Sequence, residues 1–259
     1  MKTMKVKYLG QNGFVMEWAD KKICFDLYLS NCVFELTGGG IRNYASPCEI
    51  EDLKGVNYYF ISHEHLDHLD PPTVSKMAKV SPETKFVCPV PCVHALKELG
   101  ISEECIIGAS AHKLLNLEGI QVYPVPEKHE EYSLVDGEYE NLGYVVQYEG
   151  FKLFHAGDAI ADQRLADELK EQGKFDAMFV PINGHDWKRF NADIMGNMNY
   201  REALDLCDYA GTELVVPMHY DLFNNNTENP GYFVDYLYKT YPTQNFKMLI
   251  PCEEMTIVY

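Results

Sequence analysis

Short apolar runs, rich in β-branched and aromatic side chains, alternate with polar turns along most of the chain. Runs of this kind bounded by Gly, Asn and Asp are typical of β-strands. Turns at Gly10–Gly13 and Ala19-Asp20 separate the first three runs and predict a meander. In chain order, strands are predicted at Lys5–Leu9, Phe14–Trp18, Lys22–Phe25, Asn57–Ile61, Lys85–Cys88, Cys105–Ile107, Lys113–Leu115, Ile120–Val125, Gly143–Tyr148, Lys152–Phe154, Ala177–Val180, Glu213–Val216, Lys247–Ile250 and Met255–Val258.

Apolar residues at helical spacing predict helices between many of these strands. Asp70 followed by Pro71 fits an N-cap and first turn, and Gly100, Gly173 and Gly211 fit helix ends. The mixture indicates an α/β protein. No Pro-, Gly- or Ser-rich linker interrupts it, so residues 1–259 are expected to form a single domain. Helices are predicted at Pro72–Lys79, Cys92–Leu99, Ala161–Gln172, Tyr200–Ala210 and Phe233–Thr240.

The segment from Leu27 to Val56 has no sustained periodicity and contains Gly38-Gly39-Gly40. Loops longer than about 12–15 residues in compact domains are usually functional or mobile. The alternative is a surface insertion without a role.

Composition narrows the choice of partners. The chain is 46% hydrophobic, which excludes intrinsic disorder, and its net charge of −17 disfavours nucleic acid and anionic membrane surfaces. No apolar run approaches the ~20 residues of a membrane span, and the N-terminus lacks the apolar core of a secretory signal. We therefore expect a cytoplasmic protein with reduced cysteines and a small-molecule substrate. The aromatic segment Tyr236–Tyr241 fits either a homo-oligomer interface or a core.

The strongest chemical signal is the run His63-x-His65-x-Asp67-His68, directly after a predicted buried strand. Strand ends hold side chains on a rigid frame, and imidazole and carboxylate donors suit Zn²⁺, Mn²⁺ or Fe²⁺. Six residues cannot wrap one ion with all four side chains. The alternation instead favours two neighbouring ions, with His63 and His65 facing one and Asp67 and His68 facing the other.

Further donors occur at other predicted strand ends. His129, Asp158 and His219 each follow a strand, and each alone would be a weak signal. Their common placement and their order along the chain make the set much stronger.

With these residues the chain resembles the metallo-β-lactamase superfamily over nearly its whole length. The resemblance lies in Ser-His-x-His-x-Asp-His at 62–68, a following His129, His-Ala-Gly-Asp at 155–158 and Pro-Met-His at 217–219. It implies an αββα four-layer sandwich of two mixed β-sheets flanked by helices. It also implies that His63, His65 and His129 hold one divalent metal ion, that Asp67, His68 and His219 hold a second, and that Asp158 bridges both.

The implied chemistry is hydrolysis by a metal-activated water, with Zn²⁺ or Mn²⁺ as the expected ions and iron as an alternative. Asp67 and His68 are the candidate catalytic residues, because Asp67 is placed to orient the nucleophile or shuttle a proton. Asp26 matches a position that supports the ligands from behind, the alternative being a turn carboxylate.

A closer resemblance is to the L-ascorbate-6-phosphate lactonase group. It is carried by Gly10-x-x-Gly13, the long loop after Asp26, Asn183-Gly184 and the stretch Pro217–Phe223. It implies a lactonase-like reaction on a small phosphorylated or acidic metabolite.

A phosphorylated substrate needs cations or backbone N–H groups. Arg42 and the Lys188-Arg189 pair are candidates, with ordinary surface positions as the alternative. His185 and Asp186 follow a strand end and are expected at the pocket rim, and Tyr220 is expected to touch substrate or only to pack. The candidate substrate residues are Arg42, His185, Asp186 and Tyr220.

Three other functions remain open from the sequence. A metal-dependent phosphodiesterase would use the same donors. A non-catalytic metal-binding protein would not need an open two-metal site. An oxidoreductase with iron and flavin would need a flavin-binding module, and the sequence shows none.

Overall fold

Two seven-stranded mixed sheets, each with helices, form the structure, a computed structural model that describes residues 1–259. The expected α/β fold with two mixed sheets and flanking helices is confirmed. The single domain remains a prediction, because the chain divides into two compact units. Unit 1 consists of Met1–Ala109, Leu222–Asn225 and Leu249–Tyr259, and unit 2 consists of Ser110–Asp221 and Asn226–Met248.

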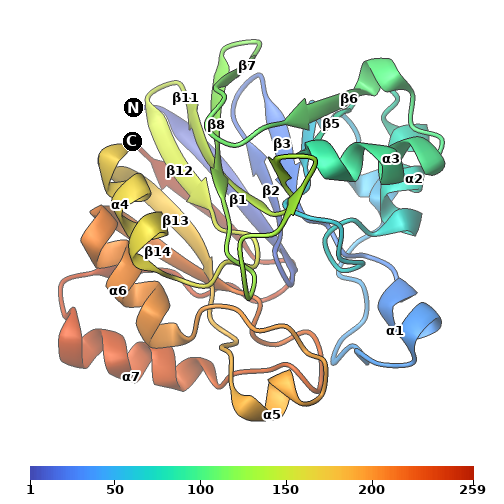
Figure 1. Cartoon of the computed structure of the whole chain (residues 1–259). Helices are drawn as coiled ribbons and strands as arrows, with labels where there is room; N and C mark the ends of the chain where they lie inside the picture. The colour runs from blue at the N-terminus through green and yellow to red at the C-terminus, as the bar shows by residue number, and fades with distance from the viewer. The chain divides into compact units, whose positions relative to one another are not determined.

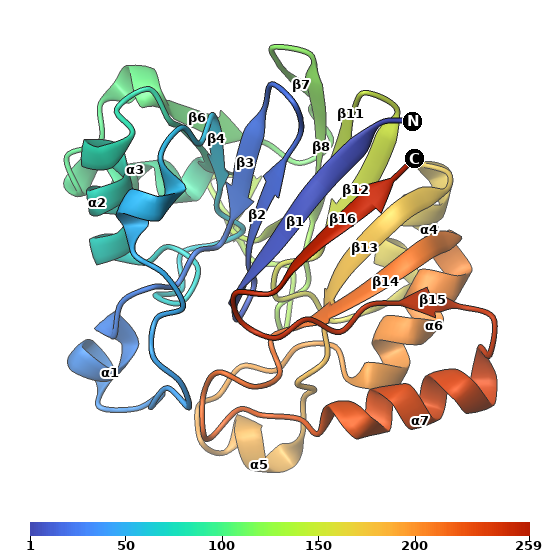
Figure 2. The same ribbon diagram turned by 180° about the vertical axis from the view of Figure 1, so that it is seen from behind.

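The sheet of unit 1 has the strand order β16-β1-β2-β3-β4-β5-β6. Strands β16 to β3 pair antiparallel, as the predicted meander requires, and β3 to β6 pair parallel. Figure 2 shows β16 beside β1, where the Lys2 amide donates to the Tyr259 carbonyl at 3.0 Å. The bounds are β1 Thr3–Gly10, β2 Gly13–Glu17, β3 Lys22–Phe25, β4 Tyr58–Phe60, β5 Lys85–Pro89, β6 Ile106–Ala109 and β16 Glu254–Val258.

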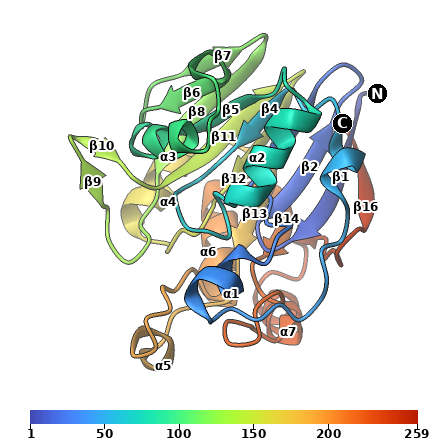
Figure 3. The same cartoon turned by 90° about the vertical axis from the view of Figure 1, so that its right-hand side faces the viewer.

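Helices α2 (Pro71–Val80) and α3 (Val93–Glu98) cover one face of this sheet (Figure 3). Their apolar side chains pack with Phe86 of β5 in one buried cluster, which fixes both helices to the sheet. Short 3₁₀ turns at η2 (Val90–Cys92) and η3 (Glu103–Cys105) flank α3. Asp70 occupies the N-cap position of α2 as predicted, but its side chain accepts hydrogen bonds from the Leu29 and Ser30 amides instead.

The predicted loop Leu27–Val56 contains helix α1 (Cys32–Thr37) and a 3₁₀ turn, η1 (Ile50–Leu53). Sequence periodicity missed both because each has fewer than seven residues, too few to show a repeat. Arg42 braces the segment by donating to the carbonyls of Tyr28, Ser30 and Tyr44 at 2.8–3.1 Å. Asp70 and Arg42 together hold the start of this segment against α2 through polar contacts.

The sheet of unit 2 has the strand order β15-β14-β13-β12-β11-β8-β7, antiparallel from β7 to β12 and parallel from β12 to β15. Strands β9 and β10 form a separate hairpin that was not predicted. The bounds are β7 Leu115–Leu117, β8 Ile120–Pro126, β9 Leu134–Val135, β10 Glu138–Tyr139, β11 Leu142–Tyr148, β12 Phe151–His155, β13 Phe175–Pro181, β14 Thr212–Met218 and β15 Asn245–Phe246.

Helices α4 (Gln163–Glu171), α6 (Tyr200–Ala210) and α7 (Pro230–Thr240) lie beside one another along the unit 2 sheet, as Figure 1 shows. A further four-residue helix, α5 (Trp187–Phe190), was not predicted. No helix of the chain is both long and apolar enough to cross a lipid bilayer.

Two of the predicted strands differ from the structure. The run Lys247–Ile250 is not a strand, because the ladder with β14 ends at Phe246 and Ile250 is 68% exposed. The strand predicted at Lys113–Leu115 begins at Leu115 instead, after a turn in which His112 has a positive φ of 64°.

Candidate metal centre

The donor loop of unit 1 begins at the carboxyl end of β4. Parallel pairing of β3 with β4 places Asp26 beside Ser62, because both residues follow paired strands at the same edge. Asp26 is fully buried and has a positive φ of 40°, which is uncommon for a residue with a side chain. A strained backbone at this position turns the carboxylate back towards the loop instead of along the strand.

Asp26 organises the ligands through hydrogen bonds. It accepts from the Ser62 amide at 2.8 Å, from the Ser62 hydroxyl at 2.7 Å and from Nδ1 of His68 at 2.9 Å. Since Nδ1 of His68 carries the proton, Nε2 keeps its lone pair for a metal ion. The Ser62 hydroxyl donates to Asp26 and therefore accepts from Nδ1 of His63, at 2.9 Å. The proton of His63 then also lies on Nδ1, so its Nε2 keeps a lone pair for a metal ion.

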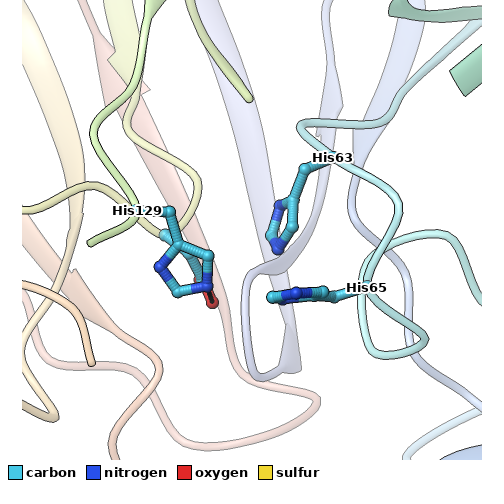
Figure 4. Close-up of side chains that lie close together, drawn as sticks. His63, His65 and His129 are labelled. Atoms are coloured by element: carbon cyan, nitrogen blue, oxygen red, sulfur yellow. Dashed lines mark ion pairs between the residues drawn. The ribbon is translucent and has the colours of Figure 1, made fainter. Parts of the chain in front are cut away.

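The other two donors of this loop lie beside the first pair. The rings of His63 and His65 meet edge to face with centroids 4.5 Å apart, and Figure 4 shows both side chains leaving the same loop. Asp67 Oδ2 lies 3.6 Å from Nε2 of His68 and accepts a 2.7 Å hydrogen bond from Nε2 of Gln11. All four predicted donors of unit 1 are therefore brought together.

The three donors of unit 2 come from three separate connections. Asp158 follows β12 and His219 follows β14, so both leave parallel strands at their carboxyl ends, whereas His129 follows the antiparallel strand β8. All three are at most 6% exposed. Oδ2 of Asp158 lies 3.3 Å from Nε2 of His219 and 3.9 Å from Nε2 of His129. One carboxylate oxygen thus approaches both histidines.

Local backbone geometry aims these donors. His219 has a positive φ of 57° directly after β14, and Glu130, next to His129, has a φ of 66°. Such conformations in residues with side chains concentrate at functional sites. His155 is buried, accepts from the Gly157 amide at 3.3 Å and stacks on Phe179, so its ring packs within unit 2.

The donor set fits divalent cations. Within unit 1, the donor atoms of His63 and His65, and those of Asp67 and His68, lie within 4.8 Å of each other, as do those of His129 and Asp158 within unit 2. Buried imidazole nitrogens and carboxylate oxygens are the ligands that Zn²⁺, Mn²⁺ and Fe²⁺ use in proteins. A protein without metal chemistry has no comparable reason to bury so many of these groups together.

Two arginines considered for substrate binding are engaged elsewhere. The Arg42 guanidinium serves three backbone carbonyls and lies over the Tyr28 ring at 4.9 Å. The Arg189 guanidinium pairs with Asp186 and donates to Asn226 and to the Thr227 carbonyl. Neither is a freely available cation for a phosphate group.

The remaining substrate candidates have mixed placements. Asp186 caps α5 by accepting from the Lys188 and Arg189 amides, and these bonds with the Arg189 charge hold the pKa of its carboxyl below the usual value. His185 is exposed, with Nε2 3.6 Å from Glu202, and His185 and Asp186 both line a cavity of unit 2. Tyr220 is 4% exposed and its carbonyl accepts from the Glu228 amide.

Sequence reasoning missed two supporting residues. Gln11, 1% exposed, was interpreted only as part of a turn, and Ser62 only as the first letter of the donor motif. The usable signal in the sequence is the tight Gly10–Gly13 turn, and the structure shows that Gln11 adopts a φ of 53° within it. A polar residue in a left-handed conformation beside a predicted metal edge is a reasonable candidate for a support role.

Comparisons with known proteins show what the whole chain is similar to. The sequence model of the Beta-lactamase superfamily domain matches residues 27–220. A protein of Pyrococcus abyssi named UPF0173 metal-dependent hydrolase is 28% identical over 89% of this chain and 90% of its own.

Solved structures show the same fold. A metallo hydrolase of the archaeon Ignicoccus hospitalis superposes with a TM-score of 0.77 at 22% identity, over 99% of both chains. An isothiocyanate hydrolase from Delia radicum gut bacteria gives a TM-score of 0.75 at 16% identity, over 97% of this chain and 98% of its own.

Proposed function

Because the chain belongs to the beta-lactamase superfamily, we propose that this metal-dependent hydrolase cleaves a carboxylic ester, with lactones as its substrate class and water as the nucleophile. Relatives named metal-dependent hydrolases match about nine-tenths of the chain and support the hydrolytic reaction. The choice of a lactone rests on the resemblance of the sequence motifs to lactonases, because a phosphodiesterase would use the same metal donors.

The observation that carries the proposal is the position of Asp158. One of its oxygens lies 3.3 Å from a histidine nitrogen on one side and 3.9 Å from another. A carboxylate in that position suits a bridge between two cations. We therefore propose that His63, His65 and His129 would hold one divalent ion and that Asp67, His68 and His219 would hold a second, with Asp158 available as a ligand to both. Zn²⁺ or Mn²⁺ are the expected ions and iron is the alternative.

Bound cations supply an acidified water and polarise the scissile carbonyl. The protein's own part begins with Asp67, whose Oδ2 is fixed by Gln11 at 2.7 Å. A carboxylate held in this way orients the attacking water, accepts its proton and returns it to the leaving alkoxide. Asp26 holds His68 with its Nε2 3.6 Å from Oδ2 of Asp67, so the two candidate catalytic side chains keep fixed positions relative to each other.

The sequence also leads us to expect that the metabolite is phosphorylated or acidic. Arg42 and Arg189 are engaged with protein groups, so the phosphate would depend on backbone N–H groups or on Lys188. For this reason we propose the lactone ring as the recognised chemistry. Whether a phosphate group on the lactone is also recognised is tested by comparing phosphorylated and unphosphorylated substrates.

The test is a lactone assay with defined metal content. The protein is stripped with a chelator and reloaded with Zn²⁺, Mn²⁺ or Fe²⁺. It is then given L-ascorbate 6-phosphate, an unphosphorylated γ-lactone and bis(p-nitrophenyl) phosphate. Turnover of a lactone that needs the metal and is lost in His65→Ala supports the proposal. Phosphodiester turnover far above lactone turnover would replace it with a phosphodiesterase. If His65→Ala still bound its ligands and kept its activity unchanged, the proposed metal-dependent hydrolysis would be wrong.

A further inference from the structure

Unit 2 contains a cavity of about 410 Å³ that no donor residue lines. Cavities of roughly 300–1,000 Å³ are the size range of small-molecule sites. Four of its lining side chains are apolar, Ile160, Trp187, Phe190 and Ile194, and carboxylates Glu130 and Asp186 also line it. Helix α5, which supplies two of them, lies in the connection from β13 to α6 (Figure 1).

The aromatic side chains of α5 are left in solvent. Trp187 is 80% exposed and Phe190 is 66% exposed, although each could bury a large area. Their helix does not depend on them, because Asp186 caps it and Arg189 ties it to Asn226 and the Thr227 carbonyl. Exposed aromatics grouped at a cavity mark a binding surface more often than isolated exposed residues do.

The cavity adjoins the donors of the same unit along the chain. Glu130 follows His129 directly, and Ile160 lies two residues after Asp158. The Ile160 amide donates to the Lys128 carbonyl at 2.7 Å, which joins the two donor segments at the cavity wall. A substrate whose reacting bond lies at these donors therefore has its remainder within reach of the aromatic side chains.

The charges at the cavity select against anions. Glu130 and Asp186 present carboxylates and no lysine or arginine lines the cavity, while Arg189 of α5 is paired with Asp186 and hydrogen-bonded to Asn226 and to the Thr227 carbonyl. His185 lies 3.6 Å from Glu202 and does not offer an unopposed positive charge. An anionic group placed here would meet like charges with little compensation.

We propose that this cavity binds an uncharged, apolar group of the substrate, aryl or alkyl, that lies against Trp187 and Phe190. The inference rests on the proposed ester hydrolysis and names its substrate class. The preferred lactone carries an apolar substituent, and a phosphate or carboxylate at the same place weakens binding.

Binding is tested without turnover. A phenyl-substituted γ-lactam, which resists hydrolysis, is titrated into the metal-loaded protein while tryptophan emission is followed. Trp187 is one of two tryptophans and the only exposed one, since Trp18 is 3% exposed. We expect a saturable shift of the emission to shorter wavelength, a weak or absent shift with the carboxylate-substituted lactam, and no shift in Trp187→Phe.

Selectivity is tested in the loaded enzyme. In Trp187→Ala/Phe190→Ala, the ratio of kcat/KM for the phenyl lactone to that for the unsubstituted lactone should fall about 10- to 100-fold, as expected for an apolar group returned to water. Leu36→Ala, which removes a 69% exposed apolar side chain of α1, is the matched control and should leave the ratio unchanged.

The two proposals fail in different ways. An emission shift with the phenyl lactam but no turnover of any lactone leaves the cavity assignment standing and removes the ester hydrolase. Lactone turnover without an emission shift and with an unaltered ratio in the double variant overturns the cavity assignment alone. Equal binding of the phenyl and carboxylate lactams also overturns it.

Discussion

Unit 1 supplies its four predicted metal donors from one loop, whereas unit 2 supplies three donors from three connections. In unit 1 the support is a chain of side-chain hydrogen bonds that converges on Asp26 and Gln11. In unit 2 the support is the sheet itself, because β12 and β14 end at the same edge and deliver Asp158 and His219 together. The same kind of donor is thus placed by two different physical devices.

The difference teaches where each half is vulnerable. A hydrogen-bonded loop depends on a few buried polar groups, so single isosteric substitutions behind the ligands should disturb it. Donors placed by strand ends depend on packing of the sheet, which is spread over many residues. Predictions can therefore be ordered by how directly they remove a donor or its support.

The largest effect is expected when a donor is removed. His65→Ala in unit 1 and His219→Ala in unit 2 should each lower hydrolysis by more than about 100-fold and reduce the bound metal, because loss of a ligand exceeds the 10- to 100-fold cost of losing a supporting residue. Metal content by plasma emission and lactone turnover measure both quantities. Full activity in one of the two variants would show that the unit concerned does not supply the site.

A smaller effect is expected behind the ligands. Asp26→Asn keeps the size of a buried side chain but cannot accept from all of its present donors, so the tautomer of His68 is no longer fixed. Metal affinity should fall about 10- to 100-fold, measured by competition with a chromophoric chelator. Asp20→Asn removes the same charge from an exposed turn of unit 1 and serves as control. Equal affinities in both variants would contradict the support role.

The contrast between the two units also explains what the sequence could predict. The four donors of unit 1 fall within six residues after an apolar strand, so their density alone identified them. His129, Asp158 and His219 became interpretable only as a set placed at successive strand ends. The core strands were predictable because their burial is continuous, as in β4 and β13, where the apolar runs coincide with the observed strands.

Other features left no periodic signal. Helix α5 has four residues, is held by a cap and a guanidinium, and turns Trp187 and Phe190 to solvent. The run Lys247–Ile250 has the composition of a strand, but Leu249 alone is well buried there. Asp26, Asp70 and Arg42 have roles set by partners more than ten residues away along the chain, and such contacts cannot be read from neighbouring residues.

The third prediction concerns the hydrogen bond to Asp67. Gln11→Met keeps the length of the side chain but removes the amide that donates to Oδ2. Hydrogen bonds to charged groups contribute about 1.5–3 kcal/mol, so kcat should fall about tenfold while metal content is retained. Gln147→Met, at an exposed position of the otherwise largely buried strand β11 of unit 2, is the matched control. If Gln11→Met lost its metal, the prediction would be wrong: Gln11 would then stabilise the metal-binding loop as a whole and not only the position of Asp67.

The smallest expected effect is a change in the pH dependence of stability, caused by one buried thiol in each unit. Burial raises the pKa of Cys88 in unit 1 from 9.0 to about 12, and burial also raises the pKa of Cys207 in unit 2. A thiol that ionises at lower pH when unfolded stabilises the folded state below pH 9, and this contribution is lost as the pH rises through the folded pKa. Between pH 9 and 10, each thiol should lower the free energy of unfolding by about 1 kcal/mol.

Urea unfolding at the two pH values measures that loss, and Cys88→Ala and Cys207→Ala should each reduce it by about 1 kcal/mol. The comparison is made within each variant, so the cavity that each substitution leaves cancels between the two pH values. If the units unfold together, both substitutions act on one transition. If they unfold separately, each substitution changes the pH dependence of one transition only, and the two units then differ in stability as well as in how they hold their donors. An equal loss in the unsubstituted protein and both variants would show that neither thiol is responsible.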